Sequence, residues 1–232
     1  MIGTVINVAT VVAGAVAGRA IGARLPDRIR ETVMHVIALI TFVIGVQMVL
    51  KSEDTLVLLL SLVFGGATGE LLHIERGIER LGVWAERRLT GASEGGDFAR
   101  GFVTTSILFC VGPMTILGCL RDGLQGDYRL LAVKATLDGI SAVAFASALG
   151  WGVLLSAGTV LVVQGALTLG AHALEPLLGS DAVKNELFAA GGVMMLALGF
   201  RLLELKQIRV ANLLPALVYA PLLVLAVRYF RG

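Results

Sequence analysis

The sequence is poor in charged residues. Only 16% of its 232 residues are Asp, Glu, Lys or Arg, whereas 56% are hydrophobic. A soluble domain carries about 25% charged residues, so this chain has too few to cover a water-facing surface. Its net charge of +2 is small, and the basic residues are spread over short connectors, which argues against nucleic-acid binding.

Cysteine is scarce, and the common catalytic motifs are missing. Cys110 and Cys119 lie nine positions apart in one apolar segment, on opposite helix faces and too far apart for a disulfide. The histidines, His35, His73 and His172, share no metal-ligand spacing. No GxSxG, HExxH or Walker motif is present. The sequence therefore predicts no catalytic residues, no metal site and no cofactor.

Long apolar runs, in contrast, are abundant. A bilayer core of about 30 Å requires about 20 apolar residues in a helix. Eight stretches qualify, near residues 2–22, 33–51, 55–73, 98–120, 130–149, 151–173, 186–203 and 210–229. The fold class is predicted as an all-α polytopic transmembrane helix bundle, with residues 1–232 forming a single integral membrane domain. The string "GFRLLELKQIRVANLL" blurs the last border, so seven spans is the alternative. The first stretch has no basic leader and is expected to be a retained span.

One connector is long enough to form structure of its own, at residues 73–97. Ile74, Ile78, Leu81 and Trp84 recur at helical spacing with Glu and Arg between them. This pattern predicts a cytoplasmic amphipathic helix in the membrane interface, followed by a flexible loop, "TGASEGGD". The helix serves either as a strut between spans or as a docking element.

The connectors also predict an orientation, because cytoplasmic loops carry an excess of Lys and Arg. One alternating set holds twelve basic residues: Arg19, Arg24, Arg28, Arg30, Arg76, Arg80, Arg87, Arg88, Arg100, Arg201, Lys206 and Arg209. The other holds six: Lys51, Arg121, Arg129, Lys184, Arg228 and Arg231. Both termini are therefore expected outside.

Two patterns suggest how the helices are related and how they pack. "GTVINVATVVAG" at 3–14 resembles "GTVLVVQGALTL" at 158–169, as in an inverted repeat of spans 1–3 and 6–8. Inverted repeats are typical of transporters, although apolar helices also align by chance. Gly14, Gly18 and Gly22 form a stripe of small residues that permits close helix contact, within the chain or across a homo-oligomer.

The fifth span contains two charges that are costly inside a bilayer. Asp138 lies near the midplane, and Lys134 lies one turn away on the same face. Ser141 adds a hydroxyl nearby. The pair forms either a cation, proton or substrate site, or a structural ion pair that locks neighbouring helices together.

The fourth span is interrupted. Gly112 and Pro113 in "CVGPMTILG" predict a helix break about halfway across, where freed backbone groups and Thr115 could line an ion site. A kink that only shapes packing is the alternative.

Four further polar residues are candidates for a path through the membrane. Asn7 and Gln164 are intramembrane amides, which either join helices or line a cavity. Asp122 in "RDGLQGD" lies at the outer mouth and Glu70 near the cytoplasmic end of span three. These two are gate candidates. The alternatives are a polar turn for Asp122 and a side chain that snorkels to the interface for Glu70.

The strings "CVGPMTILGCLRDGLQGD", "KATLDGISAVAFASALGWG" and "GTVINVATVVAGAVAG" resemble the domain-of-unknown-function 554 family of small prokaryotic membrane proteins. This resemblance covers nearly the whole chain and implies a multi-pass protein of the cytoplasmic (inner) membrane. It implies no particular activity.

Two functional hypotheses follow. The first is a transporter or channel for an ion or small solute, passive or gradient-driven, whose polar site at spans four and five is centred on Asp138. The second is a scaffold or regulator in which the polar residues serve packing alone. A lipid-modifying enzyme ranks third. The expected partners are the lipid bilayer and the unidentified ion or solute, with a second copy of the chain as a further candidate.

Overall fold

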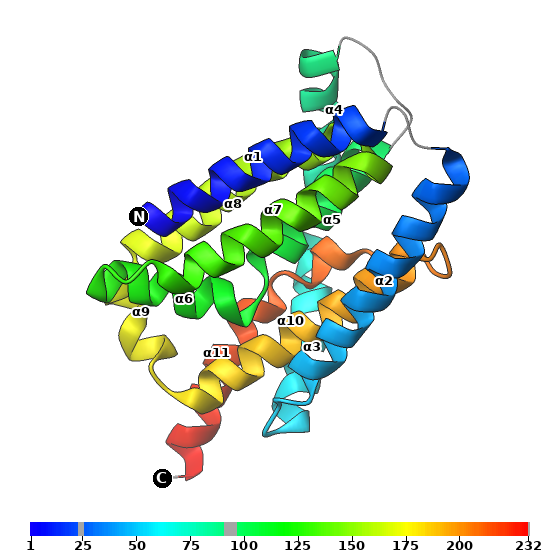
Figure 1. Cartoon of the computed structure of the whole chain (residues 1–232). Helices are drawn as coiled ribbons and strands as arrows, with labels where there is room; N and C mark the ends of the chain where they lie inside the picture. Colours follow the sequence, from blue (N-terminus) through cyan, green and yellow to red (C-terminus); the bar gives the residue numbers. More distant parts are fainter. Residues whose placement is uncertain (23–25, 91–96, 232) are drawn as a thin grey trace. The chain divides into compact units, whose positions relative to one another are not determined.

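The structure is a computed structural model that describes residues 1–22, 26–90 and 97–231 (Figure 1). Within these residues the chain forms eleven α-helices and one 3₁₀-helix and no strand, which confirms the all-α prediction. The elements are α1 (Ile2–Gly22), α2 (Asp27–Val49), α3 (Thr55–Leu71), α4 (Ile74–Thr90), α5 (Asp97–Cys110), α6 (Pro113–Gln125), α7 (Arg129–Leu149), α8 (Gly152–Leu169), α9 (Ala171–Leu178), α10 (Asp181–Leu202), η1 (Val210–Leu213) and α11 (Ala216–Arg231).

The helices have the length and composition of a polytopic membrane protein. Among the described residues, six stretches can each cross a bilayer: α1, α2, α7, α8, α10 and residues 210–229. The pairs α3–α4 and α5–α6 qualify only together, and they are bent by 54° and 58°. The bundle therefore has six to eight spans, and the predicted interruption of span four is present as the α5–α6 bend.

The chain divides into two compact units. One unit comprises residues 1–34 and 78–173, and the other comprises residues 35–77 and 174–232. The first unit holds both α1 and α8, so its limits differ from those of the predicted repeat of spans 1–3 and 6–8. The repeat stays a prediction.

In the first unit, α1 lies directly against α7 (Figure 1). A Cβ atom added at Gly14, Gly18 or Gly22 would lie within 2.4 Å of a main-chain carbonyl oxygen of α7. The glycine stripe therefore packs within the chain, on a neighbouring helix. Gly3 faces Leu131, and Gly22 faces Ser147, so the two helices run parallel.

Three more helices of this unit pack beside α1 and α7. α8 follows α7 after only two residues, and Gly150 between them has a φ of 75°. Because this turn reverses the chain, α8 runs antiparallel to α7. α5 and α6 pack on α8 and α7.

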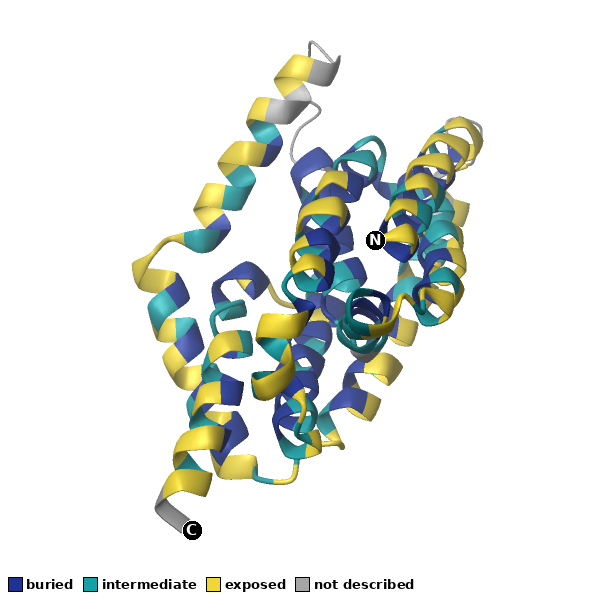
Figure 2. Cartoon of the chain, turned by 90° about the vertical axis from the view of Figure 1, so that its left-hand side faces the viewer, coloured by how far each residue is buried: buried dark blue, intermediate teal, exposed yellow. Residues whose placement is uncertain are grey.

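In the second unit, α3, α10 and α11 pack around small residues. Their shared core contains Leu58, Ala189, Ala190, Ala216 and Ala220. Figure 2 shows how burial varies along the long helices: buried residues alternate with exposed residues at helical spacing. Exposed residues on these helices include many large hydrophobic side chains, such as Leu59, Val63 and Leu222, as expected for surfaces that face lipid.

The predicted amphipathic helix corresponds to α4. Leu81 and Trp84 are exposed, and the Arg88 guanidinium lies 5.7 Å from the centre of the Trp84 ring. α4 leaves the direction of α3 by 54°. Residues 91–96, where the flexible loop is predicted, lie outside the described residues.

The close approach of α1 and α7 generates a prediction about stability. Gly18→Ala places a methyl group 2.2 Å from the carbonyl oxygen of Val143, so the helices must separate, at an expected loss of about 1–3 kcal/mol. Gly158→Ala is the control, because a Cβ there meets nothing within 4 Å. Thermal unfolding in detergent should show a lower melting temperature for Gly18→Ala alone. Equal melting temperatures would contradict the packing of α1 on α7.

Candidate functional site

An ion pair lies on the buried face of α7. The Lys134 ammonium donates a hydrogen bond to Oδ2 of Asp138, one turn away. Lys134 is 6% exposed and Asp138 is 8% exposed. Nδ2 of Asn7, on α1, donates to the same oxygen over 2.9 Å. The structure therefore brings three predicted path residues together, and their charges compensate one another within a membrane-spanning helix.

The predicted helix break lies beside this ion pair. α5 ends at Cys110 and α6 begins at Pro113. The buried Thr115 hydroxyl donates to the carbonyl oxygen of Phe109 over 3.1 Å, which ties the two helices across the break. The Lys134 ammonium lies 6.0 Å from the centre of the Phe109 ring. The carbonyl oxygen of Phe109 already accepts this hydrogen bond, so it is not free to bind an ion. A backbone-lined ion site formed by other carbonyl groups at the break stays a prediction.

Gln164 on α8 lies at the same depth as Asp138. Asp138 is twelve residues before Gly150, and Gln164 is thirteen residues after Trp151. Because α7 and α8 are antiparallel across that turn, this offset is only about 1.5 Å along the helix axis.

The contact between α1 and α8 places Gln164 level with Asn7 as well. The hydroxyl oxygens of Thr4 and Thr168 lie 3.5 Å apart. Asn7 is three residues after Thr4, and Gln164 is four residues before Thr168. α1 and α8 are antiparallel, so both steps lead in the same direction along the bundle.

The amides at this depth have atoms without partners. Among the described residues, Oδ1 of Asn7 and both Nε2 and Oε1 of Gln164 are buried and have no hydrogen-bond partner. Both residues are 0% exposed. An unsatisfied buried polar group costs about 1–3 kcal/mol, so these three atoms identify a place where a polar partner would be stabilised.

Among the described residues, the hydroxyl side chains of α7 make no hydrogen bond to the ion pair. Ser141 lies three residues after Asp138 and is partly buried. The hydroxyls of Thr136 and Ser147 donate to carbonyl groups of their own helix. Asn7, Lys134 and Asp138, which contact one another, together with Gln164, which lies at the same depth on α8, are called the amide–ion-pair cluster below.

Asp122, the outer gate candidate, caps a helix. Its Oδ2 accepts a hydrogen bond from the backbone amide of Gly3 over 3.2 Å and lies 2.9 Å from the Met1 amino group. A carboxylate at a helix N-terminus satisfies amides that lack a helical partner. This gives Asp122 a structural role, and its role as a gate stays a prediction.

Glu70, the inner gate candidate, belongs to the second unit. It is half-exposed and accepts hydrogen bonds from Arg209 and from Nδ2 of Asn212. The neighbouring Glu75 is buried and pairs with Arg201. These contacts connect the ends of α3 and α10 to η1, and the gate role of Glu70 is again a prediction.

The sequence analysis missed Glu186, a fully buried carboxylate at the start of α10. Oε1 of Glu186 accepts from the backbone amides of Glu53 and Asp54 over 2.6 and 2.8 Å, and Ser52 also donates to it. Its signal in the sequence is an acidic residue at the edge of an apolar run, "NELFAA". Such residues usually mark where a span begins, so the signal was not specific.

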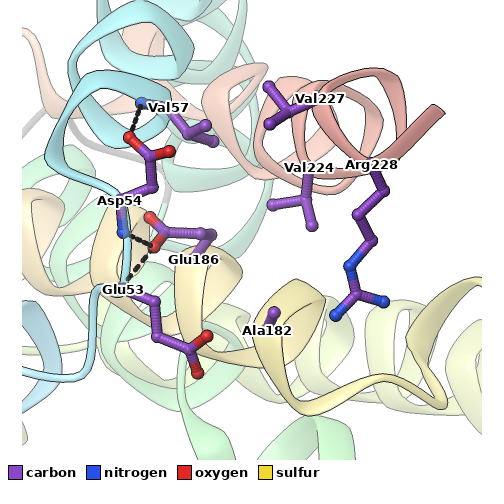
Figure 3. Close-up of a pocket in the computed structure, with 8 residues that line it drawn as sticks. All are labelled: Glu53, Asp54, Val57, Ala182, Glu186, Val224, Val227 and Arg228. Atoms are coloured by element: carbon purple, nitrogen blue, oxygen red, sulfur yellow. Dashed lines mark hydrogen bonds between the residues drawn. The ribbon is translucent and has the colours of Figure 1, made fainter. Parts of the chain in front are cut away.

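Glu186 lines a pocket of about 220 Å³ in the second unit (Figure 3). Figure 3 shows the carboxylates of Glu53, Asp54 and Glu186 on one side and Arg228 on the other. The Asp54 carboxylate accepts from the backbone amides of Leu56 and Val57 and thereby caps α3. The carboxylates of Asp54 and Glu186 already accept hydrogen bonds from backbone amides. The pocket is therefore better explained as a junction between helix ends than as a ligand-binding site.

A family model for "Protein of unknown function (DUF554)" matches residues 2–225. The chain belongs to the DUF554 family. This confirms the resemblance identified from the sequence, and it extends over both units of the structure.

Two relatives of this DUF554 protein align along nearly their whole length. "Uncharacterized membrane protein YdfK" of Bacillus subtilis (strain 168) is 27% identical over 234 residues, with 99% of this chain and 98% of the relative covered. "Uncharacterized protein YqgA" of Escherichia coli (strain K12) is 31% identical over 225 residues, with 95% and 94% covered. No solved structure matches the DUF554 chain. The name of the first relative agrees with the membrane-spanning helices described above.

The ion pair of this DUF554 protein generates a double-mutant prediction. Lys134→Met leaves a buried carboxylate, and Asp138→Asn leaves a buried ammonium, so each should cost about 3–5 kcal/mol. The double variant removes both charges and should be more stable than either single variant. Unfolding free energies of the four proteins in mixed micelles measure this coupling, and additive losses would contradict it.

Proposed function

We propose that this DUF554 protein is a transporter for an ion or a small solute, passive or driven by an ion gradient. The path passes the amide–ion-pair cluster in the first unit. The membrane-spanning helices and the family supply the membrane context. The proposal assigns no catalytic residues to the chain, so it describes a transport protein and not an enzyme.

The observation that carries the proposal is the unpartnered amide of Gln164. A residue kept only for packing would be expected to satisfy its polar atoms, because leucine at the same position would fill similar volume without their desolvation cost. Both polar atoms of Gln164 are buried without a partner in the described part of the chain. A site that binds and releases cargo needs polar atoms that are free of hydrogen bonds to the protein, because such bonds would compete with the cargo.

The burial of the ion pair favours a carrier over a permanently open pore. With Lys134 and Asp138 each less than a tenth exposed, this conformation corresponds to a closed state of the site. Cargo would then enter after a rearrangement of the surrounding helices. The α5–α6 break, which lies beside the pair, is a natural place for that movement.

A scaffold remains the second candidate, and one observation favours it. Oδ2 of Asp138 accepts from both Lys134 and Asn7, so the ion pair alone resembles a structural lock between α1 and α7. Under this alternative, changes at the cluster alter stability and nothing else.

The setting of the transporter is part of the proposal. The twofold excess of basic residues in one set of connectors supports a cytoplasmic (inner) membrane protein with both termini outside. Asp122 and Glu70 would then lie near the outer and inner ends of the spans. The α1 glycines pack on α7, so a homo-oligomer would need another surface.

Transport is tested in proteoliposomes with a defined set of probes. Sodium, potassium, chloride and protons are followed with entrapped indicators, and radiolabelled glycine, alanine, urea and glycerol with filtration. We expect at least one probe to move faster than in protein-free vesicles. The double variant K134M/D138N should reduce that rate to the protein-free level, because it removes both charges that would bind cargo.

The matched control is the double variant D181N/K184Q. Asp181 and Lys184 form an ion pair at the exposed start of α10, so this change also removes one charge of each sign. It should leave the flux unchanged. If the purified wild-type protein moves none of the probes, the scaffold is favoured and the transporter is refuted.

A stability measurement separates the two candidates independently of any substrate. Gln164→Leu removes two unsatisfied polar atoms of a fully buried side chain, so the melting temperature should rise, by an amount corresponding to about 1–3 kcal/mol. The same variant should lose flux. A lower melting temperature would show that Gln164 is needed for packing and would favour the scaffold.

A further inference from the structure

The atoms without partners in the amide–ion-pair cluster indicate the chemistry of the ligand. Both hydrogen bonds to Asp138 reach Oδ2, so Oδ1 accepts none among the described residues. Within residues 1–22, 26–90 and 97–231, Oδ1 of Asn7 and Oε1 of Gln164 are acceptors without donors, and Nε2 of Gln164 is a donor without an acceptor. The Lys134 ammonium has three N–H groups, and one of them binds Asp138. A complementary ligand must therefore both donate and accept hydrogen bonds.

Bare inorganic ions do not meet this requirement. A sodium or potassium ion could bind the open oxygens of Asn7, Asp138 and Gln164, but it would leave Nε2 of Gln164 unpaired and would repel Lys134. A chloride ion could accept from Lys134 and Gln164, but it would be repelled by Asp138 and leave the oxygens unpaired. Each ion satisfies only half of the cluster.

Charge balance supports the same conclusion. Lys134 and Asp138 neutralise each other, so the empty cluster has no net charge. An added monovalent ion would leave one uncompensated charge inside a membrane-spanning bundle, which costs several kcal/mol. A ligand without net charge avoids this cost.

We propose that the cluster binds a small zwitterion of the amino-acid class. The ligand's carboxylate would bind the Lys134 ammonium and the Gln164 amide N–H, while its ammonium would bind Asp138 and the amide oxygens of Asn7 and Gln164. The internal ion pair is thereby exchanged for two pairs with the ligand, and the total charge stays zero. Charge-assisted hydrogen bonds of this kind are stronger than bonds to a neutral solute. This inference rests on the proposed transport function for its physiological meaning, but binding itself is tested separately.

Ordered water is the competing occupant, because water also donates and accepts. Water alone would satisfy the same atoms without selecting any solute. The test must therefore show selectivity among solutes, and it must do so on the unmodified protein.

Binding is measured on the purified full-length protein by thermal shift and by isothermal titration calorimetry. The zwitterionic probes are glycine, alanine and γ-aminobutyrate, which differ in size or in the separation of their charges. The control ligands are acetate and methylammonium, which each carry one of the two charged groups, and glycine betaine, which lacks N–H donors. Sodium chloride and potassium chloride complete the set.

We expect at least one of the three zwitterions to raise the melting temperature in a saturable manner. Acetate, methylammonium, glycine betaine and the two salts should give no saturable shift. Gln164→Leu and Asn7→Leu should each raise the Kd for the zwitterion about tenfold, because each removes a side chain that would hydrogen-bond to the ligand. D181N/K184Q should leave the Kd unchanged.

Several results would overturn this inference. Saturable binding of salts or of the singly charged probes alone would assign the cluster to an ion. Failure of all three zwitterions to bind would assign it to water. In both cases ion flux in the proteoliposomes would leave the transport proposal intact. Conversely, zwitterion binding without flux of any probe would support this inference and refute the transporter.

Discussion

The first unit is organised around two opposite charges that must stay together in surroundings of low dielectric constant. Lys134 and Asp138 lie one turn apart on α7, so the helix itself holds them at bonding distance. Asn7 reaches the same carboxylate from α1, and this requires α1 to lie close to α7. The glycines along α1 permit that approach, because any larger residue would collide with main-chain atoms of α7.

The two units treat buried polar groups differently. In the second unit, Glu186 accepts from backbone amides and a hydroxyl, and Glu75 pairs with Arg201 and the Ala211 amide. These carboxylates have several partners and hold helix ends in place. In the first unit, the amide of Gln164 has none among the described residues. Polar groups whose hydrogen bonds are all formed stabilise the fold, whereas groups with free hydrogen-bonding capacity are candidates for ligand binding. This contrast distinguishes the buried carboxylates of the second unit from the amide–ion-pair cluster.

The sequence predicted what depends on local pattern. Run length located the spans, the Gly112–Pro113 step located the break, and the four-residue spacing of Lys134 and Asp138 identified their pairing. It could not assign the tertiary partners. That Asn7 would bind Asp138, or that Glu186 would bind the amides before α3, depends on contacts between distant segments. Gln164 was selected only as an intramembrane amide, and its lack of a partner among the described residues became visible once α1, α7 and α8 were placed.

The tight seating of α1 on α7 restricts how the protein can rearrange. Main-chain atoms of α7 lie close to α1 from Gly14 to Gly22, so sliding or rotating one helix against the other would cause steric collision there. We therefore expect α1 and α7 to move as one rigid body that carries Asn7, Lys134 and Asp138. Gln164 is carried by α8, outside that rigid body. An opening of the cluster would therefore separate Gln164 from the other three residues, at the contact between α1 and α8.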